Sequence, residues 1–310
     1  MSILLLLLCA FSASTFTVGK AALQYTIPLF LIGIRLLFSG IIFLIYYFYK
    51  YRELPSLHKH DYWVLAQVSF ASFYFAYAME FWALQYMTSS KTALLYNLSP
   101  VIAACFSYVV FNERMTVKKV VGLAICLLSF IPILLVPEPS ETRSIFFLSW
   151  PELGVFAAVI SFTYGWVVMR KAIKRHFIPT VFVNGSGMVI GGIAALLTTY
   201  IFQIPYLSGD GWIHAWVPMT TIMPLALWAF LLIMVGNVLS YILYGYLLHK
   251  YTATFVTLGE LATPLFAALY GWVFLNESIT WSFYFSMIVL AVGSYIFYTE
   301  EKRLGYFEHV

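Results

Sequence analysis

Three charged side chains lie inside long apolar stretches of this sequence, and they are the first candidates for chemistry. Glu80 lies in ASFYFAYAMEFWALQY, Arg35 lies in LFLIGIRLLFSG, and Glu260 lies shortly before a proline in an apolar run. A charge at membrane depth costs about 2.5–3.5 kcal/mol on insertion scales, and such residues usually serve a function. We expect Glu80 and Glu260 to be substrate counter-charges or proton-coupling carboxylates. The alternative is an internal pair with Arg35 or Lys91, or a neutral, hydrogen-bonded acid.

Arg35 has two interpretations that the sequence leaves open. Its planar guanidinium can donate two parallel hydrogen bonds, which suits the carboxylate of a substrate. It could equally pair with Glu80 as a structural lock. Lys91 lies close to a predicted helix end, and we expect its long side chain to extend its amine to the membrane surface.

The segment that carries Glu80 is rich in aromatic residues, which make up 19% of the whole chain. On a helix, positions three, four and seven apart lie on one side, so Tyr77 and Phe81 share a face with Glu80. Aromatic rings beside a carboxylate suit a cation or a flat ring. We therefore predict that Tyr77 and Phe81 contact a substrate, with Gln85 as a polar candidate nearby.

The composition indicates an integral membrane protein. Of the 310 residues, 62% are hydrophobic and only 10% are charged, whereas soluble domains carry about 25% charged residues. A helix needs about 20 apolar residues to span a bilayer, and the chain divides into ten such segments. They are 3–19, 28–49, 62–86, 92–111, 118–136, 151–169, 179–202, 224–248, 255–275 and 281–298.

One stretch of the chain occurs twice. Residues 92–116 read TALLYNLSPVIAACFSYVVFNERMT, and residues 256–280 read VTLGELATPLFAALYGWVFLNESIT. Each copy has a proline followed thirteen residues later by the glutamate of an Asn-Glu pair, Pro100 with Glu113 and Pro264 with Glu277. Self-similarity at a fixed spacing indicates an internal repeat.

The repeat predicts the architecture: an all-α membrane protein of ten transmembrane helices, arranged as two inverted five-helix repeats. Five crossings are an odd number, so the second copy must enter the membrane upside down. Inverted repeats are typical of secondary transporters, which bind substrate near the midplane between the repeats. We expect the repeats to be residues 1–137 and 151–300, joined by a linker at 138–150 and followed by a cytoplasmic tail at 301–310.

Lys and Arg residues collect in the loops on the side that holds both termini. The positive-inside rule therefore predicts a multi-pass protein of the cell (inner, cytoplasmic) membrane with both termini in the cytoplasm. The formal net charge of +4 then reflects topology and does not indicate a nucleic-acid partner.

The repeat adds further candidates. Tyr96 is the counterpart of Glu260, so both are expected to project toward the cavity between the repeats, with the polar Asn97 nearby. Pro100 and Pro264 are expected in the middle of their helices, where proline removes a backbone hydrogen bond and causes a kink. We predict that both act as hinges, the alternative being static kinks that improve packing.

The two Asn-Glu pairs have a structural interpretation. Each is expected to end one helix and to start the next, because a carboxylate favours a helix N-terminus. The GSGMVIGG segment contains Gly187 and Gly191 at a close-packing spacing. We expect these two glycines to pack within the bundle and not in a dimer.

Ten helices in two halves, each with a Pro-x12-Glu fourth helix, resemble the drug/metabolite transporter superfamily and specifically its EamA-type branch. The resemblance covers nearly the whole chain. The chain departs from it at Thr263, where many relatives have glutamate, and at Ser14-Thr15-Phe16, where many have tryptophan-glycine. The resemblance implies a secondary transporter, and some transporters of this architecture carry S-adenosylmethionine.

We accordingly expect a secondary transporter of a small organic metabolite that works by alternating access. Glu80 and Glu260 would receive the positive part of the substrate, and Arg35 would receive a carboxylate. Rings such as Tyr77, Phe81 and Tyr96 would hold its flat or apolar part. This combination favours an amino acid or an amino-acid-derived cation such as S-adenosylmethionine, moved by exchange or proton coupling.

The sequence contains no His-Glu-x-x-His, Gly-x-Ser-x-Gly or phosphate-binding glycine-rich loop, so no enzyme, cofactor or metal site is expected. The expected partners are a small-molecule substrate and the lipid bilayer, without nucleic acid, and a monomer is compatible with the sequence. Two alternatives stay open. One is an exporter of amino acids, nucleobases or drugs; the other is a non-transporting membrane scaffold or a membrane-embedded enzyme.

Overall fold

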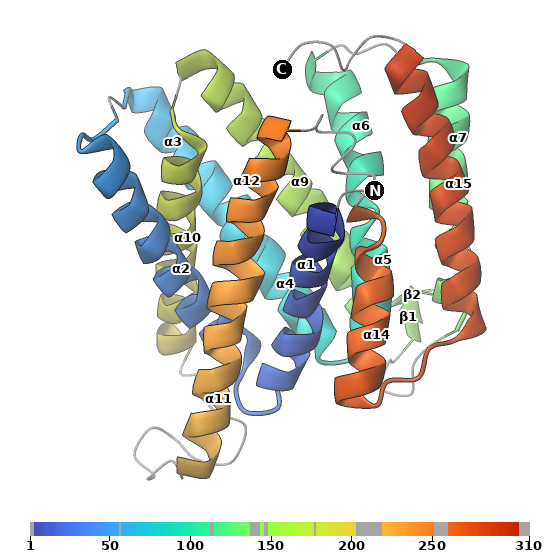
Figure 1. Ribbon diagram of the computed structural model, residues 1–310, viewed down its shortest axis with the longest axis horizontal. Helices are drawn as coiled ribbons and strands as arrows, with labels where there is room; N and C mark the ends of the chain where they lie inside the picture. Colours follow the sequence, from blue (N-terminus) through green and yellow to red (C-terminus); the bar gives the residue numbers. More distant parts are fainter. Residues whose placement is uncertain are drawn as a thin grey trace. The chain divides into compact units, whose positions relative to one another are not determined.

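The protein is described by a computed structural model that covers residues 3–55, 57–111, 115–136, 143–145, 148–176, 178–202, 219–250 and 260–303. In the first half of the chain, the elements are α1 Ile3–Ala22, α2 Pro28–Tyr51, α3 Lys59–Val68, the π-helix η1 Ser69–Phe75, α4 Ala76–Leu84, α5 Ser89–Tyr96, α6 Ser99–Phe111, α7 Val117–Leu128 and α8 Ile131–Leu134. In the second half, they are β1 Arg143–Ile145, β2 Leu148–Ser149, α9 Trp150–His176, α10 Thr180–Ile201, α11 Met219–Leu231, the π-helix η2 Leu232–Leu239, α12 Ser240–Lys250, α14 Thr263–Leu275 and α15 Trp281–Arg303 (Figure 1).

Within these ranges, 8 helical stretches are long and apolar enough to cross a membrane, and α14 is a shorter apolar helix. The predicted all-α membrane class is therefore confirmed. The stretch from α3 to α4, predicted as a span at 62–86, is not among the 8, because polar residues such as Ser69, Ser72 and Glu80 interrupt it.

The predicted linker contains one feature that the sequence did not indicate, a short antiparallel pairing of β1 with β2. The predicted tail is helical as far as Arg303.

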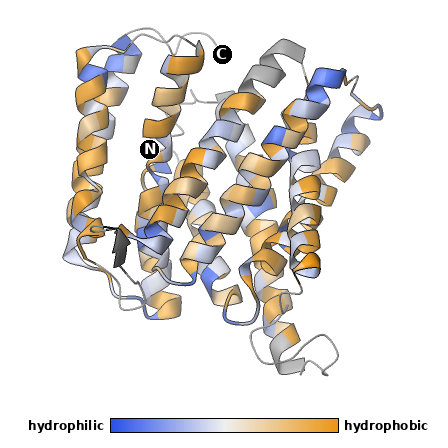
Figure 2. Cartoon of the chain, turned by 180° about the vertical axis from the view of Figure 1, so that it is seen from behind, coloured by the Kyte–Doolittle hydropathy of each residue, from blue (hydrophilic) through white to orange (hydrophobic). Residues whose placement is uncertain are grey.

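Hydropathy fits a lipid environment. Many large apolar side chains are exposed, including Phe38, Ile45 and Trp272, whereas a set of charged side chains is buried. Figure 2 shows helices coloured mainly as hydrophobic, with much of the hydrophilic colour near helix ends. This distribution is the one that acyl chains around the helices would favour.

Local irregularities of the backbone occur at matching places in the two halves. The π-helix η1 interrupts the rod from α3 to α4, and η2 interrupts the rod from α11 to α12 at the equivalent place. Two-residue turns at 97–98 and 261–262 likewise precede α6 and α14. The amides of residues 101 and 102 both bond to the Leu98 carbonyl, and those of residues 265 and 266 both bond to the Ala262 carbonyl.

The chain forms two compact units, and each combines segments from both halves of the sequence. Unit 1 comprises Met1–Thr17, Tyr86–Phe156 and Leu239–Val310, and unit 2 comprises Val18–Gln85 and Ala157–Val238. In unit 2, α2 packs mainly against α10, and in unit 1, α7 packs mainly against α15. By position in the two halves, each of these helices packs against its own counterpart.

The crossing of α2 and α10 in unit 2 relies on glycines that bring the two backbones together. A Cβ added at Gly192 would lie 3.0 Å from the Gly33 carbonyl oxygen, and one added at Gly40 would lie 2.7 Å from the Gly185 carbonyl oxygen. Residue numbers rise on one helix as they fall on the other, so the two helices are antiparallel. Such close approach through small residues is characteristic of helix pairs in membranes.

Unit 1 repeats this arrangement. A Cβ added at Gly293 would lie 2.9 Å from the Gly122 carbonyl oxygen. The Cys126 thiol lies 4.0 Å from the carbonyl oxygen of Leu290, its counterpart in the repeat. A residue that contacts its own counterpart marks a local two-fold axis, as an inverted pair of helices requires.

The predicted packing role of the GSGMVIGG glycines is confirmed. A Cβ added at Gly187 would lie 2.7 Å from the Phe73 ring, and one added at Gly191 would lie 2.8 Å from the Phe73 Cβ. Both glycines therefore allow η1 to pack closely against α10 inside unit 2.

Replacing Gly192 with alanine is expected to lower stability, because the new Cβ would lie 2.7 Å from the Leu37 backbone nitrogen. Overpacking of this kind costs about 1–3 kcal/mol. Gly245→Ala is the control, since its Cβ would meet no atom within 4 Å and alanine favours a helix by up to ~1 kcal/mol over glycine. Thermal unfolding in detergent compares the two. A Gly192→Ala protein that melts as high as Gly245→Ala would contradict the close packing.

Candidate functional site

Arg35 forms the centre of a buried polar group in unit 2. Its side chain, on α2, is 1% exposed. Its Nε and Nη2 donate hydrogen bonds to the Asn237 Oδ1 at 3.1 and 2.7 Å. Asn237, on η2, in turn donates from Nδ2 to the Ser39 Oγ at 2.7 Å. Ser39 lies one turn beyond Arg35 on α2. The side-chain amide of Asn237 on η2 therefore makes hydrogen bonds to two residues of α2.

Two aromatic rings from α4 lie against the guanidinium of Arg35. The guanidinium carbon is 4.8 Å from the centroid of the Tyr77 ring and 5.3 Å from that of Phe81. At these distances a cation is attracted to the negative face of an aromatic ring. Phe162 of α9 meets the Tyr77 ring edge-on at 6.5 Å. The predicted rings therefore lie beside a charged group, and this group is the guanidinium of Arg35.

One part of the guanidinium has no partner. The Nη1 of Arg35 is buried and makes no hydrogen bond. The bonds of Arg35 go to Asn237, so the structure does not show the Arg35–Glu80 lock that the sequence allowed. Asn237 is neutral and accepts these hydrogen bonds without cancelling charge, so among the described residues the hydrogen bonds of Arg35 go to an uncharged acceptor, whereas buried charges are normally paired.

The other two residues predicted for this region lie at different depths. Glu80, on α4, is 2% exposed, as expected of an acid that faces the interior. Gln85 is the C-cap of α4, and its side chain is exposed. Gln85 thus lies at the end of the helix and is not part of the Arg35 group.

In unit 1, Glu260 is half-buried and is the last helical residue before the turn that precedes α14. Its carboxyl group lies within electrostatic range of the Cys9 thiol on α1 and the Tyr244 hydroxyl on α12. Tyr96 has the same place before the turn that precedes α6, and its ring packs edge-on against Phe16 at 5.7 Å. The side-chain nitrogen of the next residue, Asn97, is buried without a hydrogen bond.

The predicted mid-helix position of the two prolines is wrong. Pro100 lies at the start of α6 and Pro264 at the start of α14, each just after a two-residue turn. Proline is well tolerated in a first helical turn, where its missing N–H would have no partner. Each predicted long helix is therefore interrupted and not kinked. The predicted hinge function of these breaks stays a prediction.

The side chain of Lys91 is buried and does not extend to the surface of the protein, in contrast to the prediction. Its Nζ lies 2.7 Å from the Glu152 Oε1, and the two side chains are 2% and 1% exposed. Glu152 also accepts a hydrogen bond from the Ser149 backbone amide at 2.7 Å, while its own amide donates to the Ser149 Oγ at 3.3 Å. These reciprocal bonds form a capping box at the start of α9.

Glu277 caps a helix other than the one expected. Its carboxylate accepts bonds from the Ser89 backbone amide at 2.9 and 3.1 Å, which satisfies the first turn of α5 and not of α15. Asn276, at φ 52°, does end α14 as predicted. A Cβ at Gly271 would clash with the Glu277 carboxylate in this position, so a larger residue there would require the carboxylate to shift. Glu113, its counterpart, lies outside the described residues.

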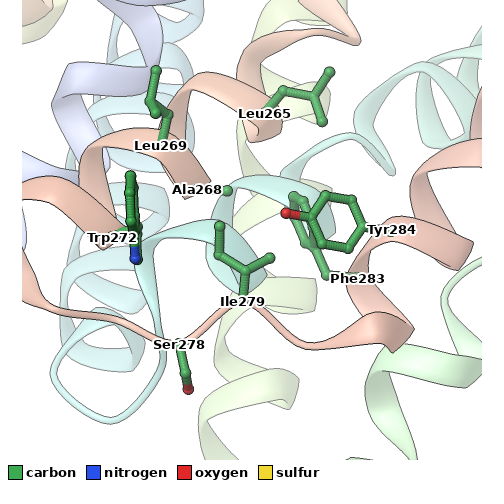
Figure 3. Close-up of a pocket in the computed structure, with 8 residues that line it drawn as sticks. All are labelled: Leu265, Ala268, Leu269, Trp272, Ser278, Ile279, Phe283 and Tyr284. Atoms are coloured by element: carbon green, nitrogen blue, oxygen red, sulfur yellow. The ribbon is translucent and has the colours of Figure 1, made fainter.

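A separate pocket lies on α14 and the start of α15. It encloses about 580 Å³ and opens at the surface, and Figure 3 shows its mainly apolar lining. The lining residues are Leu265, Ala268, Leu269, Trp272, Ser278, Ile279, Phe283 and Tyr284. None of the predicted site residues lines it, and it offers no charged group. Among the described residues, no cluster of His, Cys, Asp or Glu could hold a metal ion.

The fold and its buried polar groups define a polytopic membrane protein built from paired, antiparallel helices. The chain belongs to the EamA-like transporter family, whose sequence profile matches residues 1–135 and 149–299. The family consists of transporters, and the predicted resemblance is thereby confirmed.

Several known proteins are similar to this chain. An S-adenosylmethionine/S-adenosylhomocysteine transporter of Chlamydia muridarum is 31% identical over 99% of this chain and 94% of its own length. The protein of the same description from Chlamydia trachomatis serovar L2 is 30% identical over 99% and 91%. The uncharacterized transporter YoaV of Bacillus subtilis is 20% identical over 91% of each chain. A solved crystal structure superposes with a TM-score of 0.65 over 98% of both chains at 14% identity, which shows a shared fold.

Sequence reasoning missed two residues of these groups. Asn237 is a lone amide in the apolar run LIMVGNVL, and the cost of burying an amide without a partner could have drawn attention to it. Glu152 could have been found from the Ser-x-x-Glu spacing after Ser149, which is the signature of a capping box.

Lys91→Met is expected to destabilise the protein by roughly 3–5 kcal/mol, because it leaves the Glu152 carboxylate buried without its cation. Adding Glu152→Gln removes the buried charge and keeps an oxygen for the Ser149 amide. The double variant should therefore unfold at a higher temperature than Lys91→Met alone. Thermal unfolding in detergent measures both. Equal stability of wild type and Lys91→Met would show that the pair contributes little.

Proposed function

We propose that this protein is a secondary transporter of an amino-acid-derived metabolite, with S-adenosylmethionine as the first candidate substrate. The observation that carries this proposal is the similarity, at 30 and 31% identity over 99% of the chain, to transporters described for S-adenosylmethionine and S-adenosylhomocysteine. Relatives at this level, with no large part of either chain left unmatched, commonly keep a related substrate class.

The chemistry of the buried groups supports the proposal. S-adenosylmethionine carries a carboxylate, an ammonium, a sulfonium and a flat purine. Arg35 is a buried cation suited to the carboxylate, and the Tyr77 and Phe81 rings suit a flat or cationic part. Glu80 and Glu260 are proposed to receive the positive part of the substrate. Tyr96 and Asn97 are proposed to contribute on the side of Glu260.

We propose alternating access, coupled to exchange or to a proton gradient. The turns before Pro100 and Pro264 would serve as the flexing points, because a turn resists bending less than a continuous helix does. The protein is proposed to lie in the inner membrane with both termini in the cytoplasm and to have no enzyme activity. An exporter of amino acids, nucleobases or drugs is the alternative that the sequence left open.

Uptake by proteoliposomes tests the transport function. Liposomes containing purified protein are expected to accumulate radiolabelled S-adenosylmethionine faster than protein-free liposomes. Preloading with S-adenosylhomocysteine should accelerate uptake if the protein exchanges the two, and an inward proton gradient should do so if it is proton-coupled. Failure to move S-adenosylmethionine under any of these conditions would reject it as the substrate.

The acidic residues are tested by neutral replacements that keep the side-chain shape. Glu80→Gln and Glu260→Gln should each weaken S-adenosylmethionine binding by roughly tenfold or more, the scale of a lost charge-assisted contact. Glu53→Gln, at an exposed position, is the matched control and should bind as wild type does. Isothermal calorimetry at several pH values measures the effect. Wild-type affinity and pH dependence in both variants would remove the two carboxylates from the mechanism.

A further inference from the structure

The hydrogen bonds of Arg35 leave one edge of its guanidinium available. A guanidinium has five N–H donors in one plane. Its Nε and Nη2 point to the single oxygen of Asn237, which uses the edge that these two nitrogens share. The donors that remain belong to Nη1, which has no hydrogen bond, and to the second N–H of Nη2. They form the edge that matches the two oxygens of a carboxylate.

The orientation of Asn237 is set by Ser39. The amide nitrogen of Asn237 donates to the Ser39 hydroxyl at 2.7 Å, so the amide oxygen faces Arg35. The reversed amide would place N–H donors against the N–H donors of the guanidinium, which disfavours it. Asn237 is 0% exposed and Ser39 is 0% exposed. Asn237 therefore holds the guanidinium as a clamp that is fixed at both ends by buried side chains.

The charge of the group is as informative as its geometry. Arg35 carries one positive charge, and both groups of its clamp are neutral. An aspartate in place of Asn237 would accept the same bonds and would also neutralise the cation. Tyr77 and Phe81 attract the cation through their rings but supply no negative charge. A buried cation whose hydrogen bonds, among the described residues, go to a neutral amide is costly, and that cost falls when an anion reaches the unused edge.

The clamp lies in an unusual part of the backbone. Asn237 belongs to η2, a π-helical segment within a long helix. Such segments are rare and occur frequently at functional sites. The π-helix therefore gives a second, independent reason to attach a function to this residue.

We propose that Asn237 is a positioning residue that holds Arg35 with its Nη1–Nη2 edge free for the carboxylate of the transported molecule. It thereby makes the protein selective for ligands that carry a carboxylate. This inference rests on the proposed transport function for its ligand. It goes further because it assigns the selectivity for a carboxylate to Asn237, a neutral amide on η2.

The test compares a carboxylate ligand with its uncharged analogue. S-adenosylhomocysteine and its carboxamide differ only in the charge and donor pattern of one group. Wild type is expected to bind the acid about 10- to 100-fold more tightly, which is the scale of charge-assisted hydrogen bonds. Asn237→Asp should abolish this preference, because the new carboxylate occupies the charge of Arg35. Calorimetry with the purified full-length protein measures the ratio of the two dissociation constants.

Asn237→Asp also separates positioning from a structural role. The aspartate keeps an acceptor for Arg35, so the variant should unfold at a temperature at least as high as that of wild type while losing the preference for the acid. Asn237→Ala, which leaves Nε and Nη2 without their acceptor, should lower the unfolding temperature. Arg35→Lys keeps the charge but lacks the planar fork, and it should reduce the preference as well.

The outcomes distinguish this inference from the proposed substrate. Wild type that binds the acid and the carboxamide equally, or Asn237→Asp that keeps the wild-type ratio, overturns the inference even if S-adenosylmethionine is transported. If S-adenosylhomocysteine does not bind, the same comparison is made by thermal shift with a panel of amino acids and their carboxamides. A preference for acids that Asn237→Asp removes would then support the inference while the proposed substrate fails. Wild type that binds no acid of the panel overturns it.

Discussion

Charge buried away from water dominates the chemistry of this protein. The buried charges of Lys91 and Glu152 neutralise each other in an ion pair at 2.7 Å. Removing either residue of such a pair is costly, because it leaves the other charge buried without a partner. Arg35 is different, since its protein partners are an amide and two rings. The first arrangement is complete within the protein. The second has a buried Nη1 without a hydrogen bond, and the proposed function assigns this donor to the carboxylate of the ligand.

These polar groups need a scaffold that brings backbones close together. The glycine contacts between α2 and α10, and between α7 and α15, allow helix axes to approach within the reach of backbone atoms. Dispersion contacts and close packing hold membrane helices together where lipid tails are as apolar as the side chains. Arg35 and Ser39 lie on α2 among the glycines of such a crossing. The position of the clamp is therefore set by packing that leaves little room for adjustment.

The sequence predicted what depends on local pattern and missed what depends on distant partners. Apolar runs placed α2 and α10 within two residues of the predicted 28–49 and 179–202. Hydropathy does not separate α5 from α6, because Ser89–Val110 as a whole is apolar enough to be one membrane span despite the turn at 97–98. The bond between Arg35 and Asn237 joins residues 202 positions apart. No short-range pattern encodes it, and a lone amide in an apolar run was the only signal.

The two halves share features of the backbone but differ in the polar side chains at equivalent positions. The π-helices, the turns before the prolines and the glycine crossings all occur twice. By contrast, the counterpart of Glu80 is Tyr244, that of Glu260 is Tyr96, and that of Asn237 is Phe73. A duplicated scaffold can present equivalent conformations to the two sides of a membrane. A ligand with an acidic end and a cationic end has no such symmetry, and a symmetric set of charges would bind it no better in one orientation than in the other. The side chains at equivalent positions of the two halves differ, although the backbones are similar. This difference supplies the asymmetry that is needed to orient such a ligand.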